Sequence, residues 1–325
     1  MPWSRDTLDA VKMHRQVVFA LWLVSGVVSA GATLHGQAAQ PRTREPEARS
    51  LSGAPLNAPA LPNQATLTAD LDAAQRTLAA NPDDPEALIW VGRRFGYLWR
   101  FQESIAAFTR GIERWPDNPK FYRHRGHRYI TIRQFAKAEA DLARAAALVA
   151  GKPDEVEPDG APNPAGQPRS TLQFNTWYHL GLARYLQGNF RGALEAYTEC
   201  MKVSTNDDAV TATTDWLWMT LMRLDRKPEA AQALQRITPT MEILENQSYH
   251  RRLLMYKGLE TPASLLDTAK ADDTTIATQG YGVGNYYLVT GDRTQARAEF
   301  ERVVAGGGWN AFGFIAAEAD LLRLR

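Results

Sequence analysis

The chain has 325 residues, of which 44% are hydrophobic and 10% aromatic, which is ample material for a packed interior. Its formal net charge is +1, and a chain that is neutral in bulk offers no argument for attraction to nucleic acid or to a membrane surface. The single cysteine, Cys200, excludes an intramolecular disulfide, and we expect it to be a small buried thiol.

The N-terminus has the layout of a secretory signal. Residues 17–34 form the only long apolar run of the sequence, and basic residues precede it. Gly36 and Ala38 then offer small side chains at the −3 and −1 positions of a signal-peptidase site. We therefore expect a cleaved signal peptide over residues 1–38 and an exported protein, either periplasmic or secreted.

Two alternatives concern this leader. Translation from Met13 would give it an ordinary length and basic region. An uncleaved N-terminal anchor is the other alternative, because an apolar helix of 18 residues just spans a bilayer. In that case a single N-terminal helix would hold the protein to the membrane.

Residues 39–64 contain five prolines among small and polar residues. Such a segment buries too little apolar surface to offset the entropy lost on ordering, so we expect a disordered linker. From residue 65 onward Leu67, Leu71 and Leu78 fall on one helical face, which predicts a single helix over residues 65–82.

Proline and glycine then recur at a fixed spacing. Pro85 and Pro119 are 34 residues apart, and so are Gly92 and Gly126. Paired helices with this period are the signature of the tetratricopeptide repeat (TPR) family, which the chain resembles. The resemblance implies an all-α fold, a right-handed α-solenoid of antiparallel helix pairs.

The resemblance also divides the rest of the chain. The expected units are a half repeat, six repeats and a cap helix, at residues 65–82, 85–118, 119–150, 174–207, 208–241, 242–276, 277–310 and 311–325. Residues 151–170 interrupt the series with five prolines and four acidic residues. We expect an exposed acidic loop there, and the alternative is that it folds over the solenoid groove and occupies it.

In the TPR family the first helix of each repeat lines a concave groove. Between residues 85 and 150 there are 12 Lys and Arg against 6 Asp and Glu, so the early groove is basic. Cations beside tyrosines suit an extended peptide with carboxylates or a free C-terminus, and a solvated charged face is the alternative. In family register, the expected partner-binding residues are Arg93, Tyr97, Lys120, Arg123, His127, Tyr178 and Tyr185. Arg123 is expected to be exposed, so its loss should barely change folding.

No pattern in the sequence predicts catalysis, a metal or a cofactor. His124 and His127 are the only histidines with possible ligand spacing, and arginines surround them, which makes a cation site unfavourable. The expected function is a non-catalytic exported scaffold that binds other proteins or peptides. The alternatives are a membrane-anchored assembly factor and a metal-dependent enzyme subunit that uses His124 and His127.

The resemblance extends to one narrower group. The segments at residues 215–234 and 284–300 are similar to outer-membrane tetratricopeptide lipoproteins of the new lipoprotein I type, with the likeness covering roughly residues 85–325. This resemblance implies an envelope adaptor that brings proteases and cell-wall hydrolases together. The lipidation cysteine of that family has no counterpart beside the predicted cleavage site.

Overall fold

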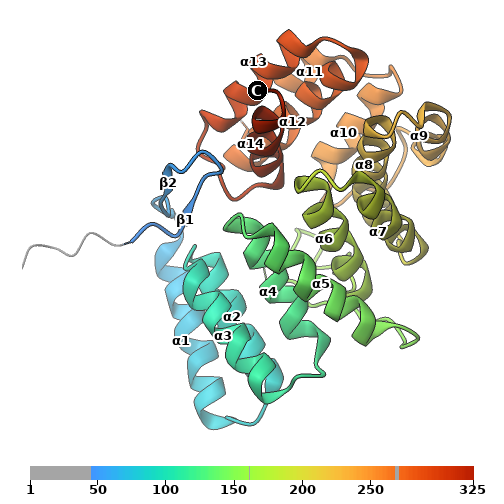
Figure 1. Ribbon diagram of the computed structural model, residues 1–325. Coiled ribbons are helices and arrows are strands. Elements are labelled where there is room, and N and C mark those ends of the chain that lie inside the picture. The colour runs from blue at the N-terminus through green and yellow to red at the C-terminus, as the bar shows by residue number, and fades with distance from the viewer. Residues whose placement is uncertain (1–44, 161, 268–270) are drawn as a thin grey trace, which may run out of the picture. The chain divides into compact units, whose positions relative to one another are not determined.

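The computed structural model describes residues 45–160, 162–267 and 271–325 (Figure 1). The predicted signal peptide and the first residues of the predicted linker lie outside the described residues. No helix within the described residues is long and apolar enough to cross a membrane.

The described residues form fourteen α-helices, one short 3-10 helix and one two-stranded β-hairpin. In chain order these are β1 (Ala48–Arg49), β2 (Pro55–Leu56), α1 (Gln64–Ala80), α2 (Pro85–Tyr97), α3 (Phe101–Arg114), α4 (Pro119–Thr131), α5 (Phe135–Val149), α6 (Leu172–Leu186), α7 (Phe190–Lys202), α8 (Asp207–Arg223), α9 (Lys227–Ala233), η1 (Leu234–Arg236), α10 (Gln247–Tyr256), α11 (Pro262–Leu266), α12 (Asp273–Thr290), α13 (Arg293–Val304) and α14 (Phe312–Arg323). Most helices pack mainly on their neighbours in the chain, and α10 lies against α8 and α12, so the predicted all-α solenoid of helix pairs is confirmed.

The recurring proline marks the start of a helix. Asp84 and Asn118 precede Pro85 and Pro119, and each accepts a hydrogen bond from the backbone N–H two residues on, at 2.9 and 3.0 Å. The side chain satisfies one of the free N–H groups of the first turn, and proline suits this turn because it needs no N–H there. The first two full repeats therefore begin with the same local chemistry.

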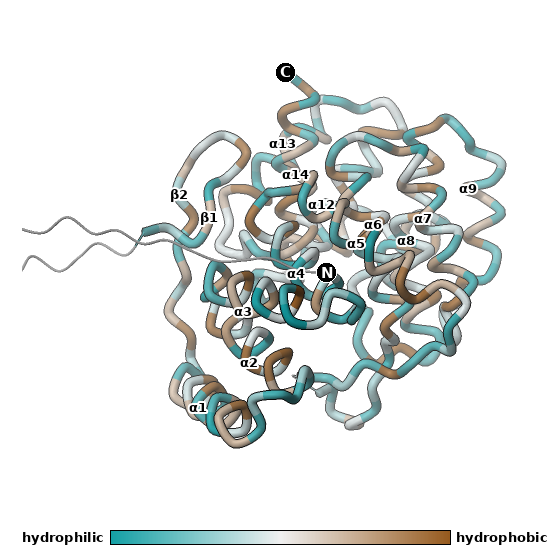
Figure 2. Tube along the Cα trace, turned by 60° about the horizontal axis from the view of Figure 1, so that its bottom comes forward, coloured by the Kyte–Doolittle hydropathy of each residue, from teal (hydrophilic) through white to brown (hydrophobic). Residues whose placement is uncertain are grey.

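The recurring glycine lets two helices approach closely. A Cβ atom at Gly92 would lie 2.4 Å from the ring of Phe108, and one at Gly181 would lie 2.6 Å from the ring of Tyr197. Each aromatic ring comes from the second helix of the pair and fills the space that the glycine leaves. Figure 2 shows the result along the tube, where hydrophobic and hydrophilic residues share each helix, as amphipathic helices in packed layers require.

The structure corrects the linker prediction for residues 45–63, which fold as a hairpin and its flanks. Ala48 pairs with Leu56, and Glu47 is buried. The Glu47 carboxylate accepts a hydrogen bond from the Phe101 N–H at 2.9 Å, at the start of α3, which has no side-chain cap of its own. One carboxylate placed at a helix N-terminus thus orders a segment whose composition predicted disorder.

The C-terminal cap reaches back to the first repeats. Glu318 of α14 accepts a hydrogen bond from Arg133 at 2.9 Å, and the Trp309 indole N–H donates to the Asn57 carbonyl at 2.8 Å. The Trp309 ring also lies edge-on to Trp99, with ring centroids 5.0 Å apart. The last helix and the N-terminal hairpin therefore meet. This contact shapes the groove described next.

Candidate binding groove

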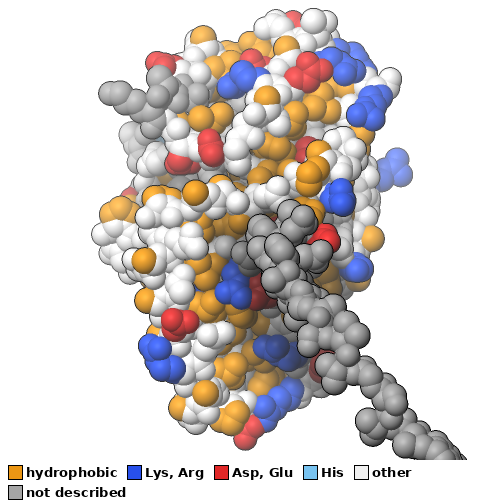
Figure 3. All heavy atoms as spheres, turned by 90° about the vertical axis from the view of Figure 1, so that its left-hand side faces the viewer, with side chains coloured by type: hydrophobic (Ala, Val, Ile, Leu, Met, Phe, Trp, Pro, Cys, Tyr) orange, Lys and Arg blue, Asp and Glu red, His pale blue; other side chains and the backbone are white. Residues whose placement is uncertain are grey.

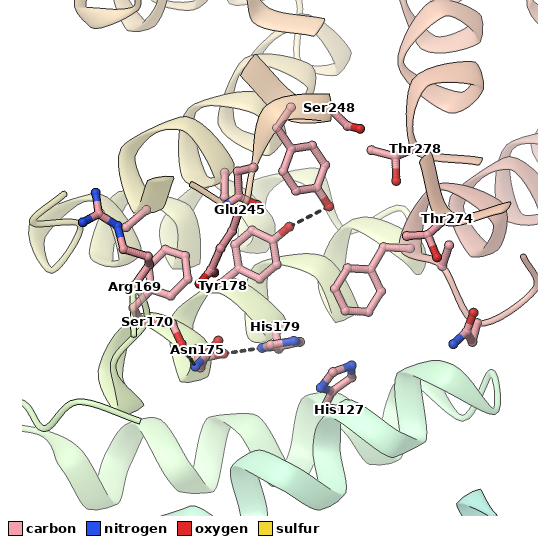
Figure 4. A pocket seen from close by; sticks show the side chains of 18 of the residues that line it. His127, Arg169, Ser170, Asn175, Tyr178, His179, Glu245, Ser248, Thr274 and Thr278 are labelled. Atoms are coloured by element: carbon pink, nitrogen blue, oxygen red, sulfur yellow. Dashed lines mark hydrogen bonds between the residues drawn. The ribbon is translucent and has the colours of Figure 1, made fainter. Parts of the chain in front are cut away.

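A groove of about 730 Å³ opens among the first helices of successive pairs (Figure 4). Its lining comes from α4, α6, α8, α10 and the N-terminal part of α12, with residues 310–312 of the cap closing one end. We call this part the open half. It is defined by Phe174, Tyr178, Tyr249, Thr278 and Phe312.

Tyrosine hydroxyls fix the wall of the open half. The Trp216 indole N–H donates to the Tyr178 hydroxyl at 2.8 Å, and that hydroxyl donates to the Tyr249 hydroxyl at 3.1 Å. Burial raises the pKa of Tyr178 well above 10, so the phenol keeps its proton. Tyr249 and Phe312 remain partly exposed to the groove. The wall thus offers aromatic surface in a fixed orientation, with polar groups around it.

Two histidines lie at the boundary between the halves. The His127 and His179 ring centroids are 4.4 Å apart, and His179 Nδ1 donates to the Asn175 carbonyl at 2.5 Å (Figure 4). Burial, together with nearby arginines, lowers the pKa of both well below 6.5. Both imidazoles are therefore neutral at pH 7.

His124 and His127, the pair named above as an alternative metal site, each have a ring nitrogen engaged by an arginine. Arg123 donates to Nδ1 of His124 at 2.9 Å, and Arg128 donates to Nδ1 of His127 at 2.8 Å. These guanidinium groups use the nitrogen lone pairs that a metal would need. Within the described residues no three potential metal-binding side chains cluster.

The adjoining part of the groove is basic and is covered by a loop of the same chain. We call it the basic half and define it by Arg93, Lys120, Arg123, His124 and Arg128. The loop over residues 151–170 folds across it, which is the second of the two predicted alternatives. Between the loop and the helices remains a cavity of about 210 Å³.

Two carboxylates of the loop hold it in place. Glu157 pairs with Arg123 at 3.0 Å, and Glu155 pairs with Lys120 at 3.0 Å. The Pro158 carbonyl also accepts a hydrogen bond from Arg93 at 2.7 Å. The loop is therefore held by cations of two neighbouring groove helices, α2 and α4.

The stem of the loop fixes its register. The Glu157 N–H donates to the Ser170 carbonyl at 3.0 Å, and the Leu172 N–H donates to the Glu155 carbonyl at 2.9 Å. Asn175 of α6 donates to the Glu157 carboxylate at 3.1 Å. An isolated antiparallel bridge between Val156 and Thr171 connects the two sides.

The positive charge of the basic half is only partly neutralised. Arg123 is 7% exposed, which corrects the prediction that it lies on the surface. Burial lowers the pKa of Arg123, which Glu157 partly offsets, and lowers that of Arg128 to about 10. Arg128 has no ion pair within the described residues, and the buried Arg123 Nε has no hydrogen-bond partner there.

Most of the predicted site residues lie on the groove. Arg93, Tyr97, Arg123 and His127 line the cavity beneath the loop, Lys120 contacts the loop, and Tyr178 lies in the open half. The structure corrects the prediction that Tyr185 lines the groove. This side chain is fully buried, and its hydroxyl hydrogen-bonds to that of Tyr281 on α12 at 2.8 Å. Helix α12 covers the place where an open groove would continue.

Several groove residues were absent from the prediction. Tyr249 belongs to a weakly conforming repeat, and Phe312 lies in the cap, where family register assigns no groove position. A single signal was available for Tyr249, namely its place in the first helix of residues 242–276. Nothing local in the sequence indicates that Phe312 returns to the groove.

Comparisons with known proteins add little beyond this geometry. No protein-family model matches the sequence, and no curated protein matches it. The structure of YrrB, a TPR protein with an unusual peptide-binding site, aligns over 72% of this chain and 92% of its own at 13% identity, with a TM-score of 0.42. The structure of Naa15/Naa10 bound to HypK-THB aligns over 75% of this chain and 36% of the matched chain at 13% identity, with a TM-score of 0.34. The likeness is one of fold alone. The fold assignment rests on the helix pairs of the chain itself.

Proposed function

We propose that the protein is a non-catalytic scaffold that binds an extended segment of a partner protein in the open half of the groove. One observation carries this proposal. The groove crosses the first helices of successive pairs and presents partly exposed aromatic rings, held in place by a hydroxyl chain, to solvent. A volume of about 730 Å³ is too large for packing and suits several residues of a peptide.

The chemistry of the lining fits a peptide better than a reaction. Aromatic rings supply apolar contact at small entropic cost, since Tyr249 and Phe312 have few rotatable bonds. Asn310 supplies an amide at the lining, and an amide pairs with both the N–H and the C=O of a backbone. The two histidines at the boundary, His127 and His179, are neutral and pack against each other, with their rings tilted by 32°.

Capture under mild crosslinking, followed by titration, tests the proposal. A partner captured from the organism's envelope extract should bind the wild-type chain, and the double substitution Tyr249→Ala with Phe312→Ala should weaken it by about a hundredfold, because two aromatic anchors are lost. Tyr129→Ala is the matched control, since this tyrosine is partly exposed on α4 but does not line the groove. Equal binding by both variants, or turnover of a substrate by the purified chain, contradicts the proposal.

We propose in addition that the protein is exported and acts as an adaptor of the cell envelope. The leader over residues 1–38 and the likeness to envelope tetratricopeptide lipoproteins support this. N-terminal sequencing of the mature protein is the direct test. A mature chain that begins after Ala38 supports export with cleavage, and an intact leader in the membrane fraction supports an anchored protein instead.

A further inference from the structure

The acidic loop contacts the basic half in the manner of a bound peptide. Glu155 and Glu157 point to Lys120 and Arg123, while Val156 between them points to solvent and is 61% exposed. Alternation of this kind is that of an extended strand. The loop is held here by its carboxylates and backbone, and Val156 contributes no apolar packing.

The loop leaves part of the basic half unsatisfied. Arg128 lines the cavity beside Glu157 and Asp159, yet no carboxylate pairs with it among the described residues. The Arg123 Nε is buried without a partner. Three guanidinium groups, of Arg93, Arg123 and Arg128, thus face two carboxylates around a cavity that is not filled. An acidic segment that reached Arg128 would fit better than the loop does, because a buried unpaired cation is costly.

The basic half and the open half are continuous. Arg123, His127 and Ser170 line both cavities. One extended chain is therefore able to run from the aromatic wall of the open half onto the arginines, provided that the loop gives up its place. Besides its ion pairs with Lys120 and Arg123, the loop is held by Arg169, which pairs with Asp208 of α8 at 3.0 Å, whereas residues 164–168 at its tip are exposed.

We propose that the basic half is a binding surface for an extended partner segment carrying two carboxylates separated by one residue, and that residues 154–160 are its built-in competitor. This inference deepens the proposed function and rests on it for the continuation of the partner into the open half. The ligand class follows from the loop itself, whose Glu-Val-Glu-Pro sequence shows which spacing the cations accept.

A peptide added to the full chain tests the proposal directly. The probe is a synthetic peptide with the sequence of residues 154–160, and the control peptide has glutamine in place of both glutamates. The protein carries Glu155→Gln and Glu157→Gln, which weaken the loop without shortening it. A tethered loop competes at an effective concentration in the millimolar range, so this double variant should bind the acidic probe at least about tenfold more tightly than the wild type does.

Substitutions on the helices identify the site of binding. Lys120→Ala in the double variant should remove most of the gain, whereas Lys137→Ala, a cation on α5 away from the groove, should leave it unchanged. The proposal is overturned if the double variant keeps wild-type helicity but binds the acidic and glutamine peptides equally. If that variant loses its helicity, Glu155→Gln alone is measured, because among the described residues its half-exposed carboxylate pairs only with Lys120. A gain of about threefold supports the proposal, and no gain overturns it.

The same probe separates this inference from the proposed function. Tyr249→Ala with Phe312→Ala should leave binding of the short acidic probe unchanged, since the probe ends within the basic half. If the acidic probe does not bind, only the inference about the basic half is overturned. If the aromatic substitutions do not weaken partner binding, only the proposed function of the open half is overturned.

Discussion

The two halves of the groove are built from equivalent helix positions but differ in chemistry and in access. The basic half, on α2 and α4, gathers cations and is covered by a loop of the same chain. The open half, on α6, α8, α10 and α12, gathers aromatic rings and hydroxyls and is open to solvent. On the surface shown in Figure 3, by contrast, basic and acidic side chains are interspersed among apolar and neutral ones.

This difference shows how a repeat scaffold separates stability from binding. In the basic half Arg123 and Glu157 are buried and depend on each other, so substitutions of this pair should affect folding. In the open half the aromatic wall is held by hydrogen bonds from behind, so the exposed rings are free to be changed. Four predictions test this separation, in order of decreasing effect.

Among single substitutions at neutral pH, removal of the Glu157 carboxylate should have the largest effect on stability. Glu157→Ala leaves Arg123 buried and unpaired, and breaking a buried ion pair on one side costs about 3–5 kcal/mol of unfolding free energy. Glu245→Ala, an exposed carboxylate at the rim of the open half, should change it by less than about 0.5 kcal/mol. Urea unfolding followed by circular dichroism measures both. Similar losses of unfolding free energy for the two variants would contradict the difference between the two halves of the groove.

Acidification should destabilise the protein through His124, His127 and His179. Burial and nearby arginines lower the pKa of each well below 6.5, so below pH 6.5 the unfolded chain binds these protons while the folded chain does not. Stability should therefore fall as the pH drops through 6.5, by about 1.4 kcal/mol per pH unit for each histidine, with no contribution at higher pH. Replacement of His127 by Gln should reduce the slope of the unfolding free energy against pH by the contribution of one histidine. An unchanged slope would show that this imidazole titrates normally.

The hydroxyl chain should matter more at its buried end than at its exposed end. Tyr178→Phe leaves the buried indole N–H of Trp216 without an acceptor, which costs about 1–3 kcal/mol. Tyr249→Phe removes only the outer partner and should cost about 0.5–1 kcal/mol. Thermal and urea unfolding compare the two. A larger loss for Tyr249→Phe than for Tyr178→Phe would mean that the hydroxyl chain is held mainly by its exposed end.

Lys120 should contribute least to stability although it contacts the loop. Its side chain is only partly buried, and its partners Glu86 and Glu155 are about half exposed, so solvent screens both pairs. We expect Lys120→Ala to cost about 0.2–1 kcal/mol. Urea unfolding in low and high salt measures this, and the difference from wild type should shrink as salt is added. A loss as large as that of Glu157→Ala would place Lys120 among the buried charges.

The sequence predicted what depends on local spacing. The 34-residue recurrence of Pro85 and Gly92 predicted the helix pairs, because a helix cap and a helix crossing each need one residue type at one place. The burial of Arg123 was not predictable in this way, because its partner Glu157 comes from a loop whose composition allowed two opposite conformations.

The remaining misses have a similar origin. The hairpin at residues 48–56 is ordered by Glu47, whose partner Phe101 lies 54 residues along the chain. Tyr185 has a groove position in the repeat register, but the register describes an open solenoid, and here α12 covers that position. In each case a contact between distant segments overrides a correct local pattern.

The contact between the C-terminal cap and the first repeats affects how the protein unfolds. In an open array of repeats each unit contacts only its neighbours, so the ends fray one unit at a time. Here Trp309 and Glu318 join the last repeat to Asn57 and Arg133, and neither end is a free end. Amide hydrogen exchange in the terminal helices should then approach the rate of global unfolding, so that residues 45–325 melt as one cooperative unit.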